Sequence, residues 1–129
     1  MTIIAPFPNR PIDESQLPIK VEYITVTTNG SGAASAVSAY INGEILKIHY
    51  NKGTVNAGTT IALTETTTTD ALDSYDVNSG TATRYPVVAL TGAAAGDNKW
   101  TRHVVADTIT ATVAGGAASK TCTVYIYYR

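Results

Sequence analysis

The sequence predicts an all-β protein: an antiparallel β-sandwich, jelly-roll-like or immunoglobulin-like, of about seven to eight strands with an extended N-terminal arm. Three observations favour this fold class. Threonine is abundant and there are 8 tyrosines, which suits the half-buried surface of a sheet. The Glu, Lys and Leu that are typical of surface helices are scarce. Short runs alternate apolar and polar residues, and Gly- and Asn-containing turn signals separate them roughly every 8–15 residues.

The first 18 residues are predicted to form an extended arm, followed by one sandwich domain over residues 19–129. Four of the 5 prolines lie in this arm, and proline restricts both itself and the preceding residue to extended geometry. The arm also carries apolar residues that are unusual for a free tail: Ile3, Ile4, Phe7, Ile12 and Leu17. Two interpretations remain open, that the arm lies across its own sandwich or that it reaches a neighbouring subunit.

The first strands can be placed from alternation and turn chemistry. A strand is expected over residues 20–28, and Asn29-Gly30-Ser31-Gly32 after it is a strong turn signal. Residues 44–50 are expected to form a strand that directs three side chains into the core: Leu46, Ile48 and Tyr50. The Asn42-Gly43 pair before this strand indicates a turn or a bulge.

The middle of the chain has weaker alternation but clear turn signals. Further strands are expected over residues 59–67, 71–77, 81–90 and 100–106. Pro86 indicates that the third of these is an edge strand or begins near that position, because proline cannot donate to a strand ladder. The small residues over 91–98 are predicted to form a loop.

Residues 107–129 are predicted to form a long antiparallel hairpin around which the other strands assemble. Apolar residues alternate with threonine and tyrosine on both sides of Gly115-Gly116: Ile109, Ala111 and Val113 before it, and Cys122, Val124, Ile126 and Tyr128 after it. A sheet with one apolar face needs a second layer, which the earlier strands are expected to supply.

Composition limits the partners and the compartment. Lys and Arg number 9 against 10 Asp and Glu, and this near-zero balance argues against binding to nucleic acid phosphates. We recognise no signal peptide and no apolar run long enough to span a bilayer, so no membrane partner is expected. The single cysteine, Cys122, is expected in the core and fits synthesis in a reducing cytoplasm.

No catalytic, cofactor-binding or metal-binding signature stands out in the sequence. Asp70, Asp73 and Asp76 are the best candidates for calcium ligands, but their spacing departs from the alternate spacing of a calcium loop, and solvated acidic surface is favoured. His49 and His103 are the two histidines that could serve as a catalytic base, yet no serine lies in a nucleophile motif. We therefore expect a protein without enzymatic activity and without a cofactor.

The tyrosines have two interpretations. Tyr125 and Tyr127 of the last predicted strand fit a subunit interface, where tyrosine is enriched, and this is favoured. The alternative is a sugar-stacking platform, because aromatic rings offer apolar faces with a polar tip. That platform would draw on further aromatic residues: Tyr40, Tyr50, Trp100 and Tyr128.

Three stretches in succession resemble those of small virion proteins of tailed bacteriophages. They are VEYITVTTNGSGAAS over residues 21–35, INGEILKIHY over residues 41–50, and DTITATVAGGAASKTCTVYIYY over residues 107–128. The shared features are a strand with an Asn/Gly-Ser-Gly turn, a strand of the N-G-[EK]-I-L type, and a final pair of strands around Gly-Gly. The resemblance covers most of the chain after residue 19.

The resemblance implies a capsid decoration (cement) protein or another head-surface component. Such a protein is a small β-sandwich present in many copies on the virion, made in the host cytoplasm, and without enzymatic activity. Its expected partners are the major capsid protein and further copies of the chain in a dimer or trimer. Two other functions remain open, a glycan-binding module on a virion or fibre and a structural component of the tail or connector.

Contacts with partners are expected from the apolar and basic residues of the arm and from the last strand. These residues are Ile3, Ile4, Phe7, Arg10, Ile12, Tyr125 and Tyr127.

Overall fold

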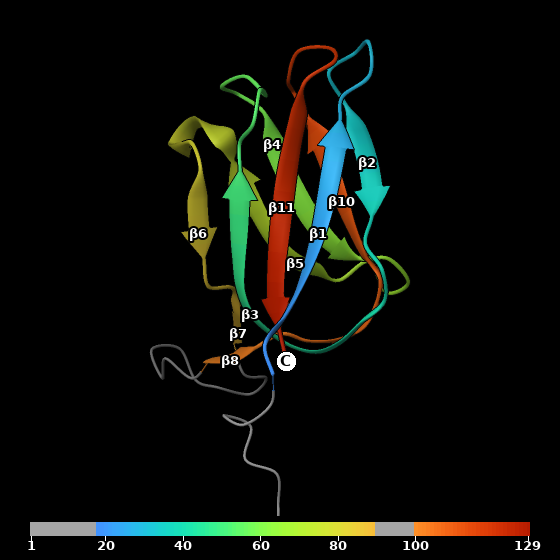
Figure 1. Cartoon of the computed structure of the whole chain (residues 1–129), viewed down its shortest axis with the longest axis vertical. Helices are drawn as coiled ribbons and strands as arrows, with labels where there is room; N and C mark the ends of the chain where they lie inside the picture. The colour runs from blue at the N-terminus through green and yellow to red at the C-terminus, as the bar shows by residue number, and fades with distance from the viewer. Residues whose placement is uncertain (1–17, 90–99) are drawn as a thin grey trace, which may run out of the picture.

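The computed structural model describes residues 18–89 and 100–129, and these residues form an antiparallel β-sandwich (Figure 1). The described residues contain 11 strands and a short 3-10 helix, Val77–Ser79. The strands are β1 (Lys20–Thr27), β2 (Ala34–Val37), β3 (Ile41–Asn51), β4 (Thr60–Glu65), β5 (Ala71–Asp76), β6 (Ala82–Arg84), β7 (Val87–Ala89), β8 (Trp100–Arg102), β9 (Val104–Asp107), β10 (Ile109–Ala114) and β11 (Thr121–Tyr128). The predicted all-β class is confirmed.

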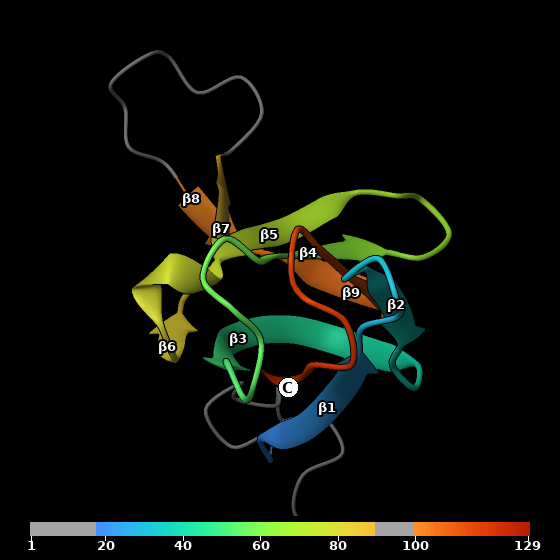
Figure 2. The same ribbon diagram turned by 90° about the horizontal axis from the view of Figure 1, so that it is seen from above.

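Two sheets form the layers of the sandwich, as the view from above shows (Figure 2). The front sheet has the order β1-β11-β3-β6, and β9 pairs with the first residues of β3. The back sheet has the order β2-β10-β4-β5. Strands β7 and β8 form a separate two-stranded ribbon at the base of the molecule, the end at which β1 begins and β11 ends (Figure 1).

The order in which the strands pair is that of a jelly roll. When the eight strands of the two main sheet paths are taken in chain order, the first pairs with the last (β1 with β11) and the second with the seventh (β2 with β10). The third pairs with the sixth (β3 with β6) and the fourth with the fifth (β4 with β5). This nested pairing is the connectivity of a double Greek key, so the jelly roll is the observed alternative of the two predicted sandwich types.

The prediction that residues 107–129 form a hairpin is wrong. β10 lies in the back sheet between β2 and β4, whereas β11 lies in the front sheet between β1 and β3. The chain between them crosses from one layer to the other. Alternation shows that each strand buries one face, but it does not identify the strand that supplies the hydrogen bonds. Both strands are nevertheless central, one in each sheet.

The crossing loop between β10 and β11 is held by the equivalent loop between β1 and β2. The hydroxyl of Thr28 donates to the carbonyl of Ala117 at 2.6 Å and accepts from the backbone N–H of Lys120 at 2.9 Å. Thr28 is buried. The backbone N–H of Gly116 donates to the carbonyl of Gly32 at 3.3 Å. These bonds satisfy polar groups that the layer crossing removes from the sheet ladders.

The predicted count of seven to eight strands is too low, because β2 was not predicted and two predicted strands are divided. Residues 81–90 yield β6 and β7 on either side of Tyr85-Pro86, since proline cannot continue the ladder. Residues 100–106 yield β8 and β9, which have different partners: β8 pairs with β7 and β9 pairs with β3. The loop predicted over residues 91–98 lies outside the described residues.

A β-bulge in β3 overturns the predicted inward orientation of Leu46. Lys47 pairs with Tyr127 and Ile45 pairs with Tyr128, so Leu46 is the extra residue without a partner on β11. Ile45 and Ile48 are therefore both fully buried, although three positions separate them, while Leu46 is only partly buried. The predicted bulge or turn at Asn42-Gly43 is not there, because both residues lie inside β3.

The core fills the space between the sheets with branched aliphatic side chains from both layers. The largest fully buried side chains include Tyr50, and Cys122 is also buried, as predicted. Each buried aliphatic side chain contributes roughly 1.5–3 kcal/mol to stability. Burial also raises the pKa of the Cys122 thiol.

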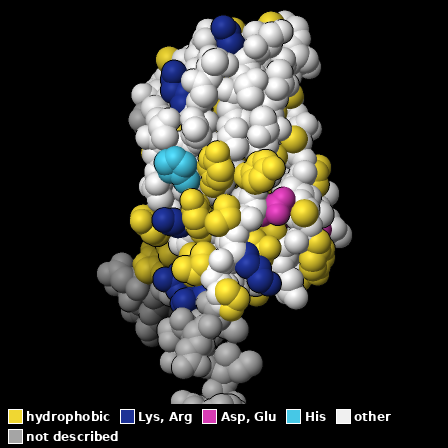
Figure 3. Space-filling model, viewed as in Figure 1, with side chains coloured by type: hydrophobic (Ala, Val, Ile, Leu, Met, Phe, Trp, Pro, Cys, Tyr) yellow, Lys and Arg dark blue, Asp and Glu magenta, His cyan; other side chains and the backbone are white. Residues whose placement is uncertain are grey.

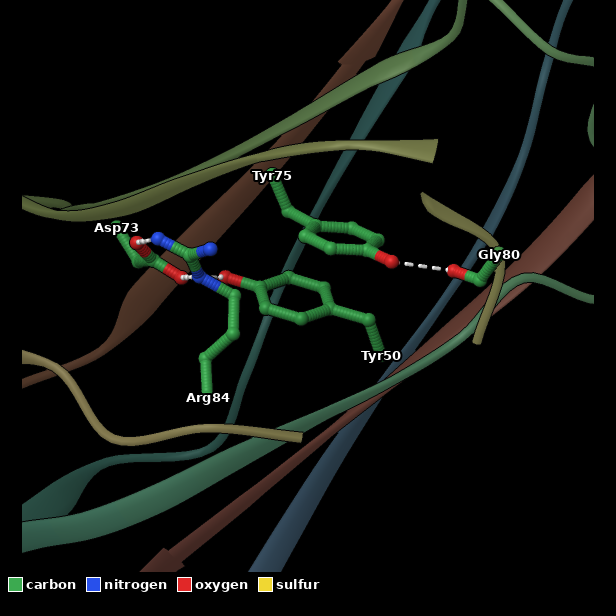
Figure 4. Close-up of polar contacts among 5 residues, drawn as sticks. All are labelled: Tyr50, Asp73, Tyr75, Gly80 and Arg84. Atoms are coloured by element: carbon green, nitrogen blue, oxygen red, sulfur yellow. Dashed lines mark hydrogen bonds and ion pairs between the residues drawn. The ribbon is translucent and has the colours of Figure 1, made fainter. Parts of the chain in front are cut away.

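A polar cluster joins the two sheets where β3 and β6 face β5 (Figure 4). The hydroxyl of Tyr50 donates to Asp73 Oδ2 at 2.8 Å, and Arg84 forms a two-pronged ion pair with the same carboxylate at 2.7 and 3.0 Å. The Tyr50 ring stacks on the ring of Tyr75 with centroids 4.5 Å apart. Burial and the adjacent Asp73 carboxylate raise the pKa of Tyr50 far above its ordinary value. The cluster therefore links the two sheets through hydrogen bonds and an ion pair at one edge of the sandwich.

Candidate functional site: an apolar and cationic base

Two of the three acidic residues considered as calcium ligands have other side-chain partners in the structure. Asp73 binds Tyr50 and Arg84, and Asp76 accepts a hydrogen bond from the backbone N–H of Asn78 at 2.9 Å. Residues 18–89 and 100–129 contain no group of three or more His, Cys, Asp or Glu side chains arranged to hold a metal ion.

Exposed large hydrophobic side chains concentrate toward the base. In this part of the molecule they come from the start of β1, from the connection between β6 and β7, from the ribbon, and from the start of β9: Ile19, Val21, Tyr23, Tyr85, Val87, Val88, Trp100 and Val104. The loops at the opposite end, over residues 28–33, 52–59 and 115–120, contain none of the exposed large hydrophobics. Figure 3 shows the same asymmetry on the front face, where yellow side chains gather in the lower half with basic ones among and below them.

A groove of about 530 Å³ opens at the base of the front sheet, and we call it the basal groove. Its lining combines apolar or aromatic side chains with three basic ones: Ile19, Leu46, Lys47, Tyr85, Arg102, Tyr127 and Arg129. These residues come from β3, β8 and the end of β11, from the residue before β1, and from the segment between β6 and β7. The groove is therefore assembled from segments far apart in the sequence.

The bulge in β3 explains how an aliphatic side chain reaches the floor of the groove. In a regular strand Leu46 would share the inward face with Ile48, because alternate residues point to the same side. The extra residue reverses this alternation, so Leu46 lies outward beside Lys47 and lines the groove. A sequence signal exists in retrospect: the adjacent apolar residues Ile45-Leu46 break an otherwise alternating run.

Basic side chains surround this apolar floor. Lys47 Nζ lies 4.5 Å from the ring centroid of Tyr127, a cation–π contact. Arg102 pairs with Glu44 at 2.8 Å, with about half of the Arg102 side chain exposed. The buried Nε of Arg129 has no hydrogen-bond acceptor among the described residues. Among the described residues, the groove thus presents more positive than negative charge.

A row of rings lies above the groove on the outer face of the front sheet. Tyr125 stands between Tyr23 and His49, with ring centroids 6.3 and 6.0 Å away. His49 Nδ1 lies 2.8 Å from the hydroxyl oxygen of Thr83. Tyr23 is 64% exposed, so this aromatic row is open to solvent. It offers ring faces and hydroxyl groups, the elements of an aromatic contact surface.

The predicted contact residues fall into two groups. Ile3, Ile4, Phe7, Arg10 and Ile12 lie outside the described residues, so their positions are not part of this structure. Tyr125 and Tyr127 lie on the outer face of the front sheet, Tyr125 in the aromatic row and Tyr127 in the basal groove.

The other members of the sugar platform do not join a single surface. Tyr50 is buried in the core with its hydroxyl bound to Asp73, and Tyr128 is partly buried against the core. Trp100 belongs to the ribbon and does not line the basal groove. A platform built from all these residues is therefore wrong. Sequence reasoning also missed Leu46, Tyr85, Arg102 and Arg129 as groove residues.

Comparison of the chain with protein-family models, curated proteins and solved structures found no match. Among residues 18–89 and 100–129, no helix has the length and apolar character required to cross a membrane.

Proposed function

We propose that this protein is a structural virion protein that binds and stabilises a phage capsid lattice, as a decoration (cement) protein does. The observation that carries the proposal is the accumulation of exposed apolar and basic side chains at the base, where the described chain begins. Exposed apolar surface of this kind is typical of a protein interaction site. The partners would be the major capsid protein and further copies of the chain in a dimer or trimer.

The mechanism is adhesion without chemistry. The arm and the exposed sheet edges at the base add contacts across neighbouring subunits of the assembly. The β7–β8 ribbon suits this role, because a two-stranded ribbon is only marginally stable alone and Val87, Val88 and Trp100 are exposed on it. Many weak contacts in a lattice sum through multivalency, so no single contact has to be strong.

The sequence resemblance supports the same function. The three stretches that resemble tailed-phage virion proteins correspond to β1 and β2 with their crossing loop, to β3, and to β10 and β11 with theirs. A jelly roll occurs in viral capsid proteins but also in lectins and other proteins, so the fold alone does not assign a function. The proposal therefore rests on the basal surface and the resemblance together.

Deletion of residues 1–18 tests the proposal. The truncated protein should keep its cooperative unfolding transition but lose co-sedimentation with phage heads that lack the protein, because the arm supplies the lattice contacts. Electron microscopy of decorated particles should place the full chain on the head surface. Full attachment by the truncated protein, or density confined to the tail or connector, would contradict the proposal.

A glycan-binding module is the second candidate, and the exposed aromatic row Tyr23–Tyr125–His49 is the observation that favours it. Sugars stack on exposed aromatic rings. A glycan array probed with the full chain and with variants Tyr125→Ala, Tyr127→Ala and Trp100→Ala separates the two functions. Specific glycan binding that Tyr125→Ala removes would support this candidate, whereas an array without signal would leave the capsid function favoured.

A further inference from the structure

We propose that the basal groove is the docking site for the N-terminal arm, residues 1–17, of a second copy of this chain. The proposal rests on the homo-oligomer proposed above and deepens it, because it identifies both the segment and the surface that join the copies. Each copy would lend its arm to a neighbour and accept an arm in its own groove. The exchange would link neighbours on a lattice without requiring a large rigid interface.

The apolar chemistry of the arm matches that of the groove. The groove presents two tyrosine rings, Tyr85 and Tyr127, beside the aliphatic side chains of Ile19 and Leu46. The arm has prolines at positions 6, 8 and 11 interleaved with Ile, Phe and Leu residues. Proline-rich segments favour the polyproline II conformation, and such segments dock in grooves lined by aromatic rings. A groove of about 530 Å³ has room for a few side chains of such a segment and not for the whole arm.

The charges are complementary as well. The arm carries the adjacent acidic residues Asp13 and Glu14 against a single basic residue, Arg10. The groove carries Lys47 and Arg129, in addition to an Arg102 that already pairs with Glu44. Arg129 is only partly buried and lines the groove, so a carboxylate from the arm would pair with its guanidinium group through a charge-assisted hydrogen bond, which is among the stronger kinds.

Geometry favours the arm of a second copy over the arm of the same copy. The described chain starts at Pro18, and Ile19 already lines the groove, so the groove lies at the point where the arm joins the domain. At about 3.1 Å per residue, a polyproline II segment of 17 residues would span on the order of 50 Å, whereas a folded chain as long as this protein has a radius of gyration of about 14 Å. Returning Phe7 to its own groove would require a reversal within residues 8–18, which contain three prolines and no glycine.

Sedimentation equilibrium of the full-length protein, without any capsid present, tests the association. We expect the mean mass to rise with protein concentration and the association to weaken by about tenfold or more in Leu46→Asp, which places a carboxylate on the groove floor. Val37→Asp is the matched control, because it places the same group on an exposed apolar residue of the back sheet, and it should associate like the unmodified protein. Urea unfolding of each variant checks that its fold is retained.

A charge exchange tests the pairing of arm and groove directly. Lys47→Glu should weaken association, and adding Asp13→Lys with Glu14→Lys in the same chain should restore most of it. A purely structural effect of Lys47→Glu would not be rescued by changes in the arm. Absence of rescue in folded variants would therefore contradict the electrostatic part of the proposal.

A photoreactive benzophenone analogue of phenylalanine at position 7 identifies the occupant. Irradiation should produce covalent dimers whose cross-linked peptides contain groove residues. A cross-link within a single chain, cross-links that avoid the groove, or a full-length protein that stays monomeric at all concentrations would overturn the proposal. These measurements involve no capsid, so a full-length protein that self-associates but does not attach to phage heads would count against the proposed function alone.

Discussion

Gly32 and Gly30 lie two positions apart in the same crossing loop but have different constraints. Gly32 adopts φ +78, and a Cβ there would lie 1.7 Å from the carbonyl oxygen of Gly116. Gly30 has no heavy atom within 4 Å of an added Cβ. The close approach at Gly32 is the point at which the two crossing loops meet, so an added side chain there would push these loops apart.

We predict that Gly32→Ala lowers the free energy of unfolding by at least about 2 kcal/mol, because the substitution adds both a backbone clash and an unfavourable φ. Gly30→Ala should change it by no more than about 0.5 kcal/mol, as at an ordinary surface position. Urea denaturation of the two variants measures the difference. Equal changes in unfolding free energy in the two variants would show that contact between the crossing loops does not constrain Gly32.

Tyr50 is a second residue whose role is only visible in the folded protein. Its hydroxyl donates to the partly buried Asp73 carboxylate, which Arg84 also binds. We predict that Tyr50→Phe costs about 1–2 kcal/mol of unfolding free energy, because the carboxylate loses one donor. Tyr125→Phe is the control, since the Tyr125 hydroxyl forms no hydrogen bond with the described residues. Chemical denaturation at neutral pH should separate the two variants.

The pKa of Tyr50 predicts a loss of stability in alkali. Its pKa in the folded protein is raised above the ordinary value of 10.0, so the folded state holds the proton more tightly than the unfolded state. The stabilisation is complete below about pH 10 and is lost as the pH rises above it, because the unfolded state then ionises first. Above about pH 10, the free energy of unfolding should fall less steeply with pH in Tyr50→Phe than in the unmodified protein. Parallel curves for the two proteins would contradict a raised pKa of Tyr50 in the folded state.

At the scale of elements, the bulge in β3 converts a core position into a surface position. Pairing of Lys47 with Tyr127 and of Ile45 with Tyr128 leaves only Leu46 without a partner. The residue can therefore be removed without changing which other side chains face the core. Bulges next to binding sites often redirect a side chain in this way.

We predict that deletion of Leu46 yields a folded protein with a regular β3, and that this protein lacks the groove floor and associates weakly. Deletion of His49, in the regular part of the same strand, should prevent folding, because it would turn Ile48 outward and Lys47 inward. Circular dichroism and unfolding curves distinguish the outcomes. If both deletion proteins fold equally well, the bulge does not set the orientation of these residues.

Strand pairing illustrates what local sequence can and cannot predict. Alternating threonine and aliphatic residues predicted β10 and β11 as strands and predicted their buried residues, because alternation reports one buried face. It did not predict their partners, since the register that joins Thr27 to Thr121 brings together residues far apart in the chain. Leu46 was misplaced for the same reason, as the bulge is defined by the partner strand.

The whole molecule is polarised between its two ends. Loops at one end consist largely of small and polar residues, whereas the base combines the groove, the ribbon and the point at which the described chain begins (Figure 1). This asymmetry predicts that the base faces the partner and that the opposite end faces solvent.

Site-specific blocking tests this orientation. Under the proposed function, a polymer attached through Val88→Cys on the ribbon should prevent attachment to phage heads, whereas the same polymer attached through Gly30→Cys at the opposite end should leave attachment intact. The natural thiol should not interfere, because Cys122 is buried. Co-sedimentation of the two labelled proteins gives the result, and inhibition by the Gly30 label alone would reverse the proposed orientation.

The sequence by itself determined the all-β class, most of the strands and many of their buried residues, because these depend on side-chain size, alternation and turn chemistry within short segments. Only the tertiary structure decided that the sandwich is a jelly roll, that the last two strands belong to opposite sheets, and that Leu46, Tyr85, Arg102, Tyr127 and Arg129 line one groove. The physical reason is that pairing and surface shape depend on hydrogen bonds and contacts between segments distant in the chain, and no local pattern encodes them.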